Sequence, residues 1–346
     1  MMRWFSSLVI LGLLTINLHL HGEENVGRIK HDNANGSNLL VESKNAIAIM
    51  TYNIQQLGYA NWMANHFEKE RLALIPETIL ALDPAPDVLV LQEVFTENSF
   101  EFLINELAIS YPYHTEVIGQ DCESADWTSV AGNCQQNTWK GNGGVFILSR
   151  WPIEEKHAYI YHAGRVSRTF DFLAQKGVVY ASISVAGQGR TQQIHVLGTH
   201  LQADSESHDI RMLQLKEMRR WFDKFEVAKS EAVILAGDFN VSSNDPLKFA
   251  ELLKQTRSRL VFSEGAIGSK SPSTNRYLNI ISSGKTEKTL DFILYRTDHL
   301  IPVIEPTLVV LNFKSAGPWQ GQRLFSDPVE MNDLSDHYPT FMLLEY

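Results

Sequence analysis

The C-terminal stretch 335–344 reads Ser335-Asp336-His337-Tyr338-Pro339-Thr340-Phe341-Met342-Leu343-Leu344. Its apolar end predicts a last strand that begins after the proline. An aspartate and a histidine at the rim of such a strand offer a metal ligand and a general base at adjacent positions. A polar turn that simply precedes a strand would look the same. The interpretation therefore depends on whether the rest of the chain supplies partners for the pair.

Two apolar runs early in the chain also end in polar side chains. Residues 47–54 predict the first strand, and Asn53 lies near its end, where an asparagine also commonly caps a turn. Residues 87–94 form a continuous apolar run typical of a strand buried on both faces, and they deliver Glu93. A carboxylate at that position needs a cation or a basic partner, although a surface salt bridge would also satisfy it.

Two later runs repeat the same layout. Residues 193–201 predict a strand that ends at His200, which as a single histidine is also compatible with a structural role in the core. Residues 232–241 predict another strand, which ends with Asp238 and Asn240. Side chains two positions apart on an extended backbone point to the same side, so this pair is the more specific signal.

A further acid, Asp291, lies within the apolar run 289–295. Such a buried carboxylate needs a partner, most simply a histidine. Oxygen ligands without cysteine favour Mg²⁺ over structural zinc, with Mn²⁺ or Co²⁺ as substitutes. Acids and histidines at successive strand ends predict metal-assisted hydrolysis, most naturally of a phosphate ester.

Helical patterns separate these runs, so we expect a single α/β or α+β catalytic domain over residues 45–346. The predicted helices cover residues 62–82, 100–108, 207–227 and 245–256. A polar loop is expected at 265–284. Its segment 265–271 superficially resembles a phosphate-binding loop, but the glycine spacing is two and Ser269 precedes Lys270, which argues against nucleotide binding.

Composition narrows the partners and the compartment. The net charge of −10 argues against nucleic acid as the main partner, because such binding relies on Lys and Arg. Residues 1–22 are typical of a signal peptide, which implies a secreted protein, and residues 23–44 of a flexible leader. A short signal anchor is the alternative. Cys122 and Cys134 are expected to form a disulfide in an exported chain, rather than remain free.

Residues 307–327 predict a hairpin with Trp319 near its tip, next to Pro318. An exposed tryptophan at a tip suits a bilayer interface or a partner protein. Packing of this side chain back onto the domain is the alternative.

Seven motifs together resemble the endonuclease/exonuclease/phosphatase (DNase I-like) superfamily and, within it, the secreted bacterial-type neutral sphingomyelinases. They are Thr-Tyr-Asn-Ile at 51–54, Leu-Gln-Glu-Val at 91–94, Gly-Gly-Val-Phe-Ile-Leu-Ser-Arg-Trp-Pro-Ile at 143–153, Gly-Thr-His-Leu-Gln-Ala at 198–203, Ala-Gly-Asp-Phe-Asn-Val at 236–241, Leu-Asp-Phe-Ile-Leu at 290–294 and Ser-Asp-His-Tyr-Pro at 335–339. The resemblance covers the chain from about Asn45 to its end. Before Asn275 the chain lacks the Trp-Asp pair expected from the family.

The resemblance implies a four-layer α/β sandwich with two central mixed β-sheets and helices outside. It also implies hydrolysis of sphingomyelin to ceramide and phosphocholine at the outer leaflet of a membrane, by a peripheral monomer. The implied roles are Mg²⁺ binding by Glu93, Asn53 and Asp336, base catalysis by His337 with Asp291, positioning by Asp238 and Asn240, and leaving-group stabilisation by His200. The implied membrane-docking residues are Trp319 and Pro318.

Two other hypotheses compete with this one. A secreted nuclease of the same fold predicts a basic groove, which the acidic composition disfavours. A catalytically silent toxin or adhesin would bind membranes through the hairpin but would have no need of the acids and histidines.

Overall fold

The computed structural model describes residues 46–58, 66–119, 125–134, 141–164, 170–187, 190–262, 267–322 and 327–346. The predicted signal peptide and flexible leader, residues 1–44, lie outside the described residues, as does Cys122. Within the described part of the chain, no helix is long and apolar enough to cross a membrane.

Two β-sheets form the centre of the domain. Among the described residues the first sheet has seven strands in the order β11-β13-β16-β1-β2-β5-β3. These strands are β1 (Ala46–Gln56), β2 (Val88–Val94), β3 (Tyr113–His114), β5 (Phe146–Ser149), β11 (Val261–Phe262), β13 (Thr307–Val310) and β16 (Thr340–Glu345). Strand β1 pairs with β2 in parallel and with β16 antiparallel, so the sheet is mixed.

The second sheet, over the same described ranges, has seven strands in the order β10-β12-β9-β8-β7-β6-β4. They are β4 (Ser129–Gly132), β6 (Ile153–Ile160), β7 (Gly177–Gly187), β8 (Arg190–His200), β9 (Ala232–Asp238), β10 (Ser258–Arg259) and β12 (Asp291–Arg296). Strands β8 and β9 are parallel, and their register places His200 opposite Asp238. Strand β12 is antiparallel to β9 and places Asp291 opposite Asp238.

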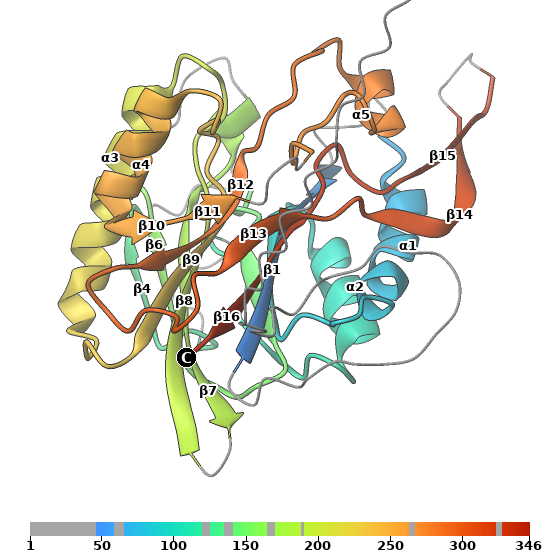
Figure 1. The fold of residues 1–346 in the computed structure, drawn as a ribbon. Coiled ribbons are helices and arrows are strands. Elements are labelled where there is room, and N and C mark those ends of the chain that lie inside the picture. The colour runs from blue at the N-terminus through green and yellow to red at the C-terminus, as the bar shows by residue number, and fades with distance from the viewer. Residues whose placement is uncertain are drawn as a thin grey trace, which may run out of the picture. The chain divides into compact units, whose positions relative to one another are not determined.

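Helices cover the outer face of each sheet (Figure 1). Helices α1 (Glu68–Leu80) and α2 (Glu97–Leu107) pack on the first sheet, and α3 (His208–Phe222) and α4 (Pro246–Thr256) pack on the second. The expectation of a four-layer sandwich with two mixed central sheets is therefore confirmed. Three of the predicted helices begin or end several residues from their expected limits, and Pro76 is accommodated inside α1.

Alternation along β1 explains how the layers hold together. Ile47 and Ile49 face the core between the two sheets, whereas Ala48, Met50 and Tyr52 face the core beneath α1 and α2. Strand β8 approaches the first sheet closely at Gly198, where an added Cβ would lie 2.7 Å from Cγ1 of Val90. The inter-sheet spacing next to the end of β8 therefore depends on the absence of a side chain.

Two expectations for the C-terminal third are corrected. The loop expected at 265–284 contains a short helix, α5 (Arg276–Ile281), which the side chain of Asn275 caps. The hairpin is built from β14 (Lys314–Gly321) and β15 (Val329–Asp333), while 307–310 belongs to the first sheet.

Trp319 does not lie at the tip of this hairpin. It pairs with Met331 within the ladder, is 7% exposed, and packs edge-on against Phe67, with Tyr277 beside it. The prediction of an exposed tip tryptophan is wrong, because these aromatic rings, distant in sequence, give the indole an apolar site on the domain. Pro318, its neighbour, is exposed.

Candidate active site

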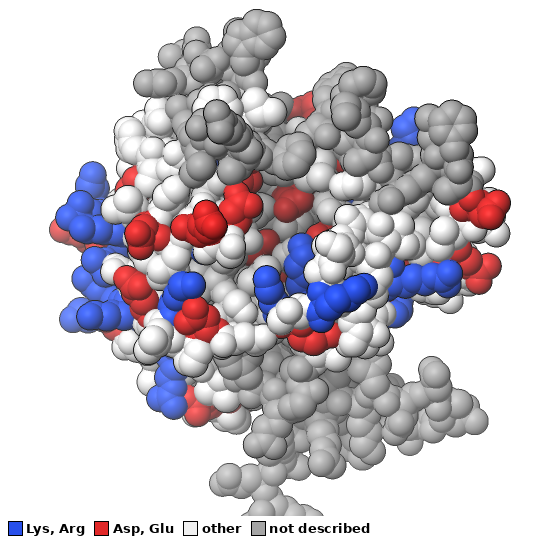
Figure 2. Space-filling view, turned by 90° about the horizontal axis from the view of Figure 1, so that it is seen from above, with Lys and Arg blue, Asp and Glu red and all other residues white. Residues whose placement is uncertain are grey.

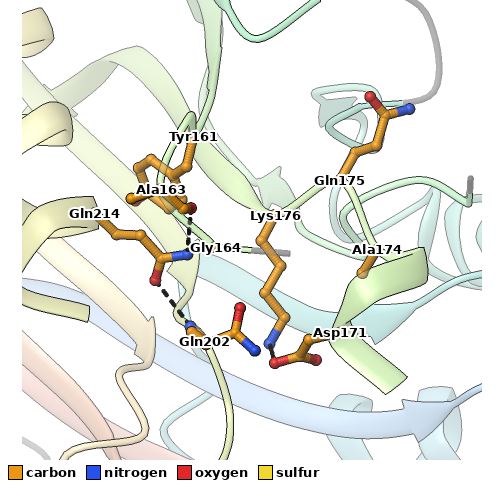
Figure 3. Close-up of a pocket in the computed structure, with 9 residues that line it drawn as sticks. All are labelled: Tyr161, Ala163, Gly164, Asp171, Ala174, Gln175, Lys176, Gln202 and Gln214. Atoms are coloured by element: carbon orange, nitrogen blue, oxygen red, sulfur yellow. Dashed lines mark hydrogen bonds and ion pairs between the residues drawn. The ribbon is translucent and has the colours of Figure 1, made fainter. Parts of the chain in front are cut away.

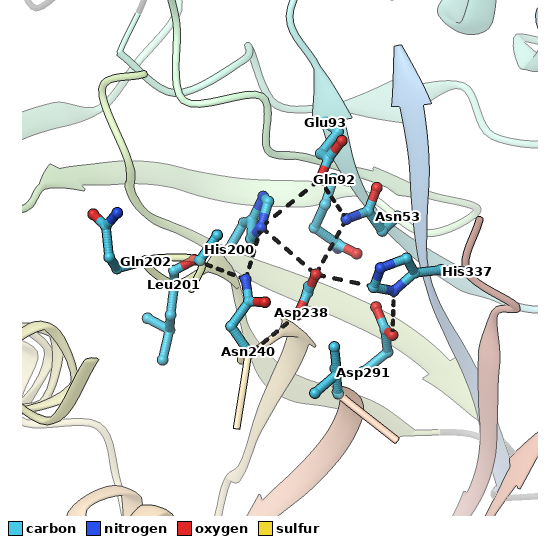
Figure 4. Close-up of polar contacts among 12 residues, drawn as sticks. Asn53, Gln92, Glu93, His200, Leu201, Gln202, Asp238, Asn240, Asp291 and His337 are labelled. Carbon is cyan, nitrogen blue, oxygen red and sulfur yellow. Dashed lines mark hydrogen bonds and ion pairs between the residues drawn. The ribbon is translucent and has the colours of Figure 1, made fainter. Parts of the chain in front are cut away.

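The side chains predicted from the strand ends meet at one end of the two sheets (Figure 4). Strands β1 and β2 of the first sheet supply Asn53 and Glu93. The second sheet supplies His200 from β8, Asp238 from β9 and Asp291 from β12. Figure 2 looks onto this end and shows acidic side chains toward its middle, with basic side chains close by. The gathered residues are Asn53, Glu93, His200, Asp238, Asn240, Asp291, Asp336 and His337.

Asn53 connects the two carboxylates of what we call the acidic cluster, Glu93, His200 and Asp238. Its amide nitrogen donates to Glu93 Oε1 at 2.8 Å and to Asp238 Oδ2 at 3.1 Å. His200 Nε2 lies 3.6 Å from Asp238 Oδ2 and 4.0 Å from Glu93 Oε1. The cluster thus joins the first sheet to the second.

Left-handed backbone at two positions aims these side chains. Glu93 has φ = 61° and Asn240 has φ = 50°. Leu89 and Leu91 face α1 and α2, so regular alternation would turn Glu93 away from the second sheet. The left-handed residue breaks this alternation and brings the carboxylate to Asn53. Non-glycine residues in this conformation store local strain, typically where function requires it.

The acidic cluster lacks enough positive charge of its own to balance its two carboxylates. Burial, and then the carboxylate of Asp336, raise the pKa of Glu93 to about 7. Burial, and then Asp291, raise the pKa of Asp238 to about 6. Burial, followed by Lys176, lowers the pKa of His200 well below its usual range, which keeps the imidazole neutral. One ligand atom from each cluster member lies within 4.8 Å of the others, and two carboxylates with a neutral imidazole fit a divalent cation.

His337 and Asp291 form the second functional unit. His337 Nδ1 lies 2.7 Å from Asp291 Oδ2, which also accepts a hydrogen bond from Ser269 Oγ at 2.6 Å. Burial alone would lower the pKa of His337, but Asp291 and Asp336 together raise that pKa to about 9. The predicted partnership of these residues is present, and it leaves Nε2 facing away from the acid.

Asp336 pairs with a lysine that sequence reasoning had set aside. Lys270 Nζ lies 2.7 Å from Asp336 Oδ2 and 3.2 Å from His337 Nε2. Burial would raise the pKa of Asp336, but the positive charges of Lys270, His337 and Arg71 together lower the pKa to about 2. Asp336 lies outside the two groups whose geometry suits a metal among the described residues. Its metal role therefore stays a prediction. The 66-residue separation between Lys270 and Asp336 gave no local signal for this contact.

A buried ion pair supports the segment after His200, and sequence reasoning missed it as well. Lys176 Nζ lies 2.9 Å from Asp171 Oδ2 and donates to the Leu201 carbonyl at 2.8 Å. The same carbonyl accepts a hydrogen bond from Asn240 Nδ2, which also lies 3.1 Å from His200 Nε2. Lys176 and Asp171 line a small polar pocket with Gln202 (Figure 3).

The remaining predicted residues lie elsewhere. Pro318 and Trp319 belong to β14, and Cys134 packs against the core between the sheets. Because Cys122 lies outside the described residues, the disulfide stays a prediction.

Comparison with known proteins agrees with this geometry. The model of the Endonuclease/Exonuclease/phosphatase family matches residues 50–337, so the chain belongs to this family. The fold is also shared with a Caenorhabditis elegans TDP2 structure at 14% identity, with a TM-score of 0.54 over 87% of this chain and 98% of that one.

Within the family, the chain belongs to the bacterial group of sphingomyelinase C and beta toxin. It is 30% identical to a sphingomyelinase C from Bacillus cereus over 85% of this chain and 87% of that protein. It is also 27% identical to beta toxin from Staphylococcus aureus in a structure with bound magnesium ions. That match has a TM-score of 0.75 and covers 87% of this chain and 100% of the beta toxin chain. The protein is thus a sphingomyelinase C-like phosphodiesterase with a candidate metal site.

Proposed function

We propose that this protein hydrolyses sphingomyelin to ceramide and phosphocholine, with Mg²⁺ as its cofactor. The observation that carries the reaction type is the 2.7 Å contact of His337 with Asp291, beside the acidic cluster. The choice of lipid is supported by the relatives named sphingomyelinase C.

The chain's own residues supply the proton transfers and the positioning. His337 accepts a proton from the attacking water at Nε2, because Nδ1 is held by Asp291. Asp238 and Asn240 position the water and the phosphoryl oxygens. His200, neutral in its buried position, stabilises the departing ceramide oxygen through a hydrogen bond.

Glu93, with Asn53 and Asp238 beside it, would hold Mg²⁺. When bound, the cation supplies positive charge that stabilises the negative charge of the phosphoryl group in the transition state. Asp336 is proposed to support the same side of the site, although its contact in the structure is to Lys270.

The remaining proposals concern where the enzyme works. We propose export through residues 1–22 and peripheral action on the outer leaflet as a monomer. Nucleic acid is not proposed as a partner, in view of the net charge of −10. With Trp319 buried, the exposed Pro318 is the remaining predicted docking residue of the hairpin.

The test compares three substrates in the presence of Mg²⁺: sphingomyelin vesicles, phosphatidylcholine vesicles and duplex DNA. Phosphocholine release from sphingomyelin is expected, and EDTA or Glu93→Ala should abolish it. The matched control is Glu101→Ala, which removes an exposed carboxylate from α2 and should keep wild-type activity.

Equal or faster cleavage of DNA would refute the lipid assignment in favour of a nuclease. Vesicle binding without hydrolysis of any of the three substrates would instead identify a catalytically silent membrane-binding protein.

A further inference from the structure

Lys270 is a charged group at the candidate site that the proposed mechanism does not use. Its side chain is 30% exposed, whereas its partner Asp336 is 9% exposed and His337 only 4%. The other lysine near the site, Lys176, is 4% exposed and already bound to Asp171 and a backbone carbonyl. Lys270 is therefore the better placed of the two lysines to meet an entering anion.

The segment that carries Lys270 is held in place on both sides. Its backbone exchanges two hydrogen bonds with Lys288, at 2.8 and 3.0 Å. The carboxylate of Glu287 accepts hydrogen bonds from Gly268 N, Ser271 Oγ and Ser273 N. Next to Lys270, Ser269 donates to Asp291. Because the backbone of Lys270 is already fixed, less conformational entropy is lost when its ammonium binds a ligand.

The position of the ammonium matters for the base. Lys270 Nζ lies 3.2 Å from His337 Nε2, the nitrogen that must accept the proton of the attacking water. An ammonium has three donors and no acceptor. Its contact with Asp336 uses one donor, its contact with His337 uses a second when Nε2 is unprotonated, and the third is left for a ligand oxygen.

These contacts point to a role for Lys270 in the reaction, and that role rests on the proposed phosphodiester hydrolysis. We propose that Lys270 is a further catalytic residue, whose ammonium leaves His337 Nε2 to donate a hydrogen bond to a non-bridging phosphoryl oxygen of the bound substrate. The same movement frees Nε2 to accept the proton of water. No covalent bond forms or breaks at the lysine, and its ammonium keeps all three protons.

The interaction of Lys270 with the substrate therefore has two consequences. The ammonium is a preorganised donor that stabilises the negative charge of the phosphoryl group in an otherwise acidic site. Its departure from His337 also makes the base available only when a phosphate is bound. The phosphate shared by diester substrates and inorganic phosphate is the chemistry that Lys270 recognises.

The experiment uses the full-length protein loaded with Mg²⁺ and compares Lys270→Met with Lys288→Met. Lys288 is the backbone partner of Lys270 and has an exposed side chain, so it controls for loss of a lysine in the same bridge. Turnover of bis(p-nitrophenyl) phosphate should fall about 10²-fold in kcat for Lys270→Met. Calorimetry with inorganic phosphate should show affinity about tenfold weaker, while Lys288→Met matches the wild type.

A purely structural role is separated by stability and by Lys270→Arg. Under the proposal, Lys270→Arg restores most of the phosphate affinity, and Lys270→Met keeps a wild-type affinity for Mg²⁺ or binds it more tightly. The proposal is overturned if Lys270→Met keeps wild-type kcat and phosphate affinity. It is also overturned if Lys270→Met and Lys270→Arg each lose thermal stability, Mg²⁺ affinity and phosphate affinity together.

Neither probe contains sphingomyelin, so the two proposals fail separately. A wild-type enzyme that ignores sphingomyelin but shows the Lys270 effect on phosphate would refute the lipid substrate alone. Sphingomyelin hydrolysis that is unchanged in Lys270→Met, with unchanged phosphate affinity, would refute the role of Lys270 alone.

Discussion

Glu93 shows how a single residue sacrifices stability for chemistry. Its carboxylate is largely buried, shares Asn53 with Asp238 and is destabilised by Asp336, and its backbone is left-handed. Each of these features disfavours the ionised side chain or the conformation that carries it. A bound cation reverses the electrostatic part of this cost, which is the physical reason for the predicted metal dependence.

The first prediction concerns the stability of the metal-free protein. The folded pKa of Glu93, about 7, lies above its ordinary value of 4.5, so its contribution to stability is complete below pH 4.5 and is lost as pH rises through 7. In EDTA, the free energy of unfolding should fall between pH 5 and 8 by about 1–3 kcal/mol. Glu93→Gln should make this fall smaller, as measured by urea denaturation at each pH.

Asp238 has a raised pKa of the same sign, so Glu93→Gln reduces the pH dependence without removing it. The control Glu101→Gln should keep the wild-type slope. Identical slopes in the wild type and Glu93→Gln would show that Glu93 ionises normally in the fold.

The second prediction separates the proposed base, His337, from the acid proposed to orient it, Asp291. His337→Ala should abolish turnover with folding intact, while Asp291→Asn should lower kcat by about 10²- to 10⁴-fold. Because Asp291 raises the pKa of His337, its removal should move the acidic limb of the pH-rate profile to lower pH. The measurement is a pH-rate profile with a soluble diester. An acidic limb that stays in place would mean that Asp291 does not control the ionisation of His337.

At the scale of elements, sequence patterns located the strands that carry the site residues and the polar side chains near their ends. Continuous apolar runs define β2 and β9, and a polar residue that ends such a run is visible without any tertiary information. What the patterns could not supply is contact between distant segments. The glycine spacing around Lys270 argues only against a nucleotide-binding loop, and it carries no sign of the contact with Asp336 in another segment.

The hairpin illustrates the same limit in the opposite sense. Trp319 follows a Gly-Pro turn signal, so local rules place it at a tip. Its burial depends on Phe67 before α1 and Tyr277 in α5, and no local rule connects these three rings.

The third prediction follows from that burial. Trp319→Ala should destabilise the domain by about 3–5 kcal/mol, because it removes a large side chain from a packed aromatic cluster. Pro318→Ala, its exposed neighbour, should leave the unfolding midpoint nearly unchanged. Denaturant unfolding of both variants checks this. Wild-type stability combined with lost vesicle binding in Trp319→Ala would restore its original docking role.

At the scale of the molecule, the candidate site exists only between the two sheets. Asn53 and Glu93 come from the first sheet, whereas His200, Asp238 and Asp291 come from the second. Their separation depends on inter-sheet packing, including the close approach of Gly198 to Val90.

The fourth prediction is that Gly198→Ala strongly lowers kcat while the domain stays folded with a modest loss of stability. The new methyl group would overlap Val90, so the sheets must shift beside His200, and overpacking costs about 1–3 kcal/mol. A displacement near 1 Å at the site can lower kcat by about 10²-fold. The control Gly284→Ala meets its nearest atom at 3.5 Å and should be tolerated. Equal turnover of the two variants would contradict this view of the inter-sheet spacing.

The pairing of β1 with β16 places nearly the first and last described residues side by side, with Ala46 opposite Glu345. Asn53 lies two residues beyond Thr51, the last residue of β1 that pairs with β16, and His337 lies just before β16. During synthesis, the segments that carry Glu93, His200 and Asp238 all emerge before the base does. Under the proposed mechanism, a polypeptide truncated before His337 lacks the base and should be inert.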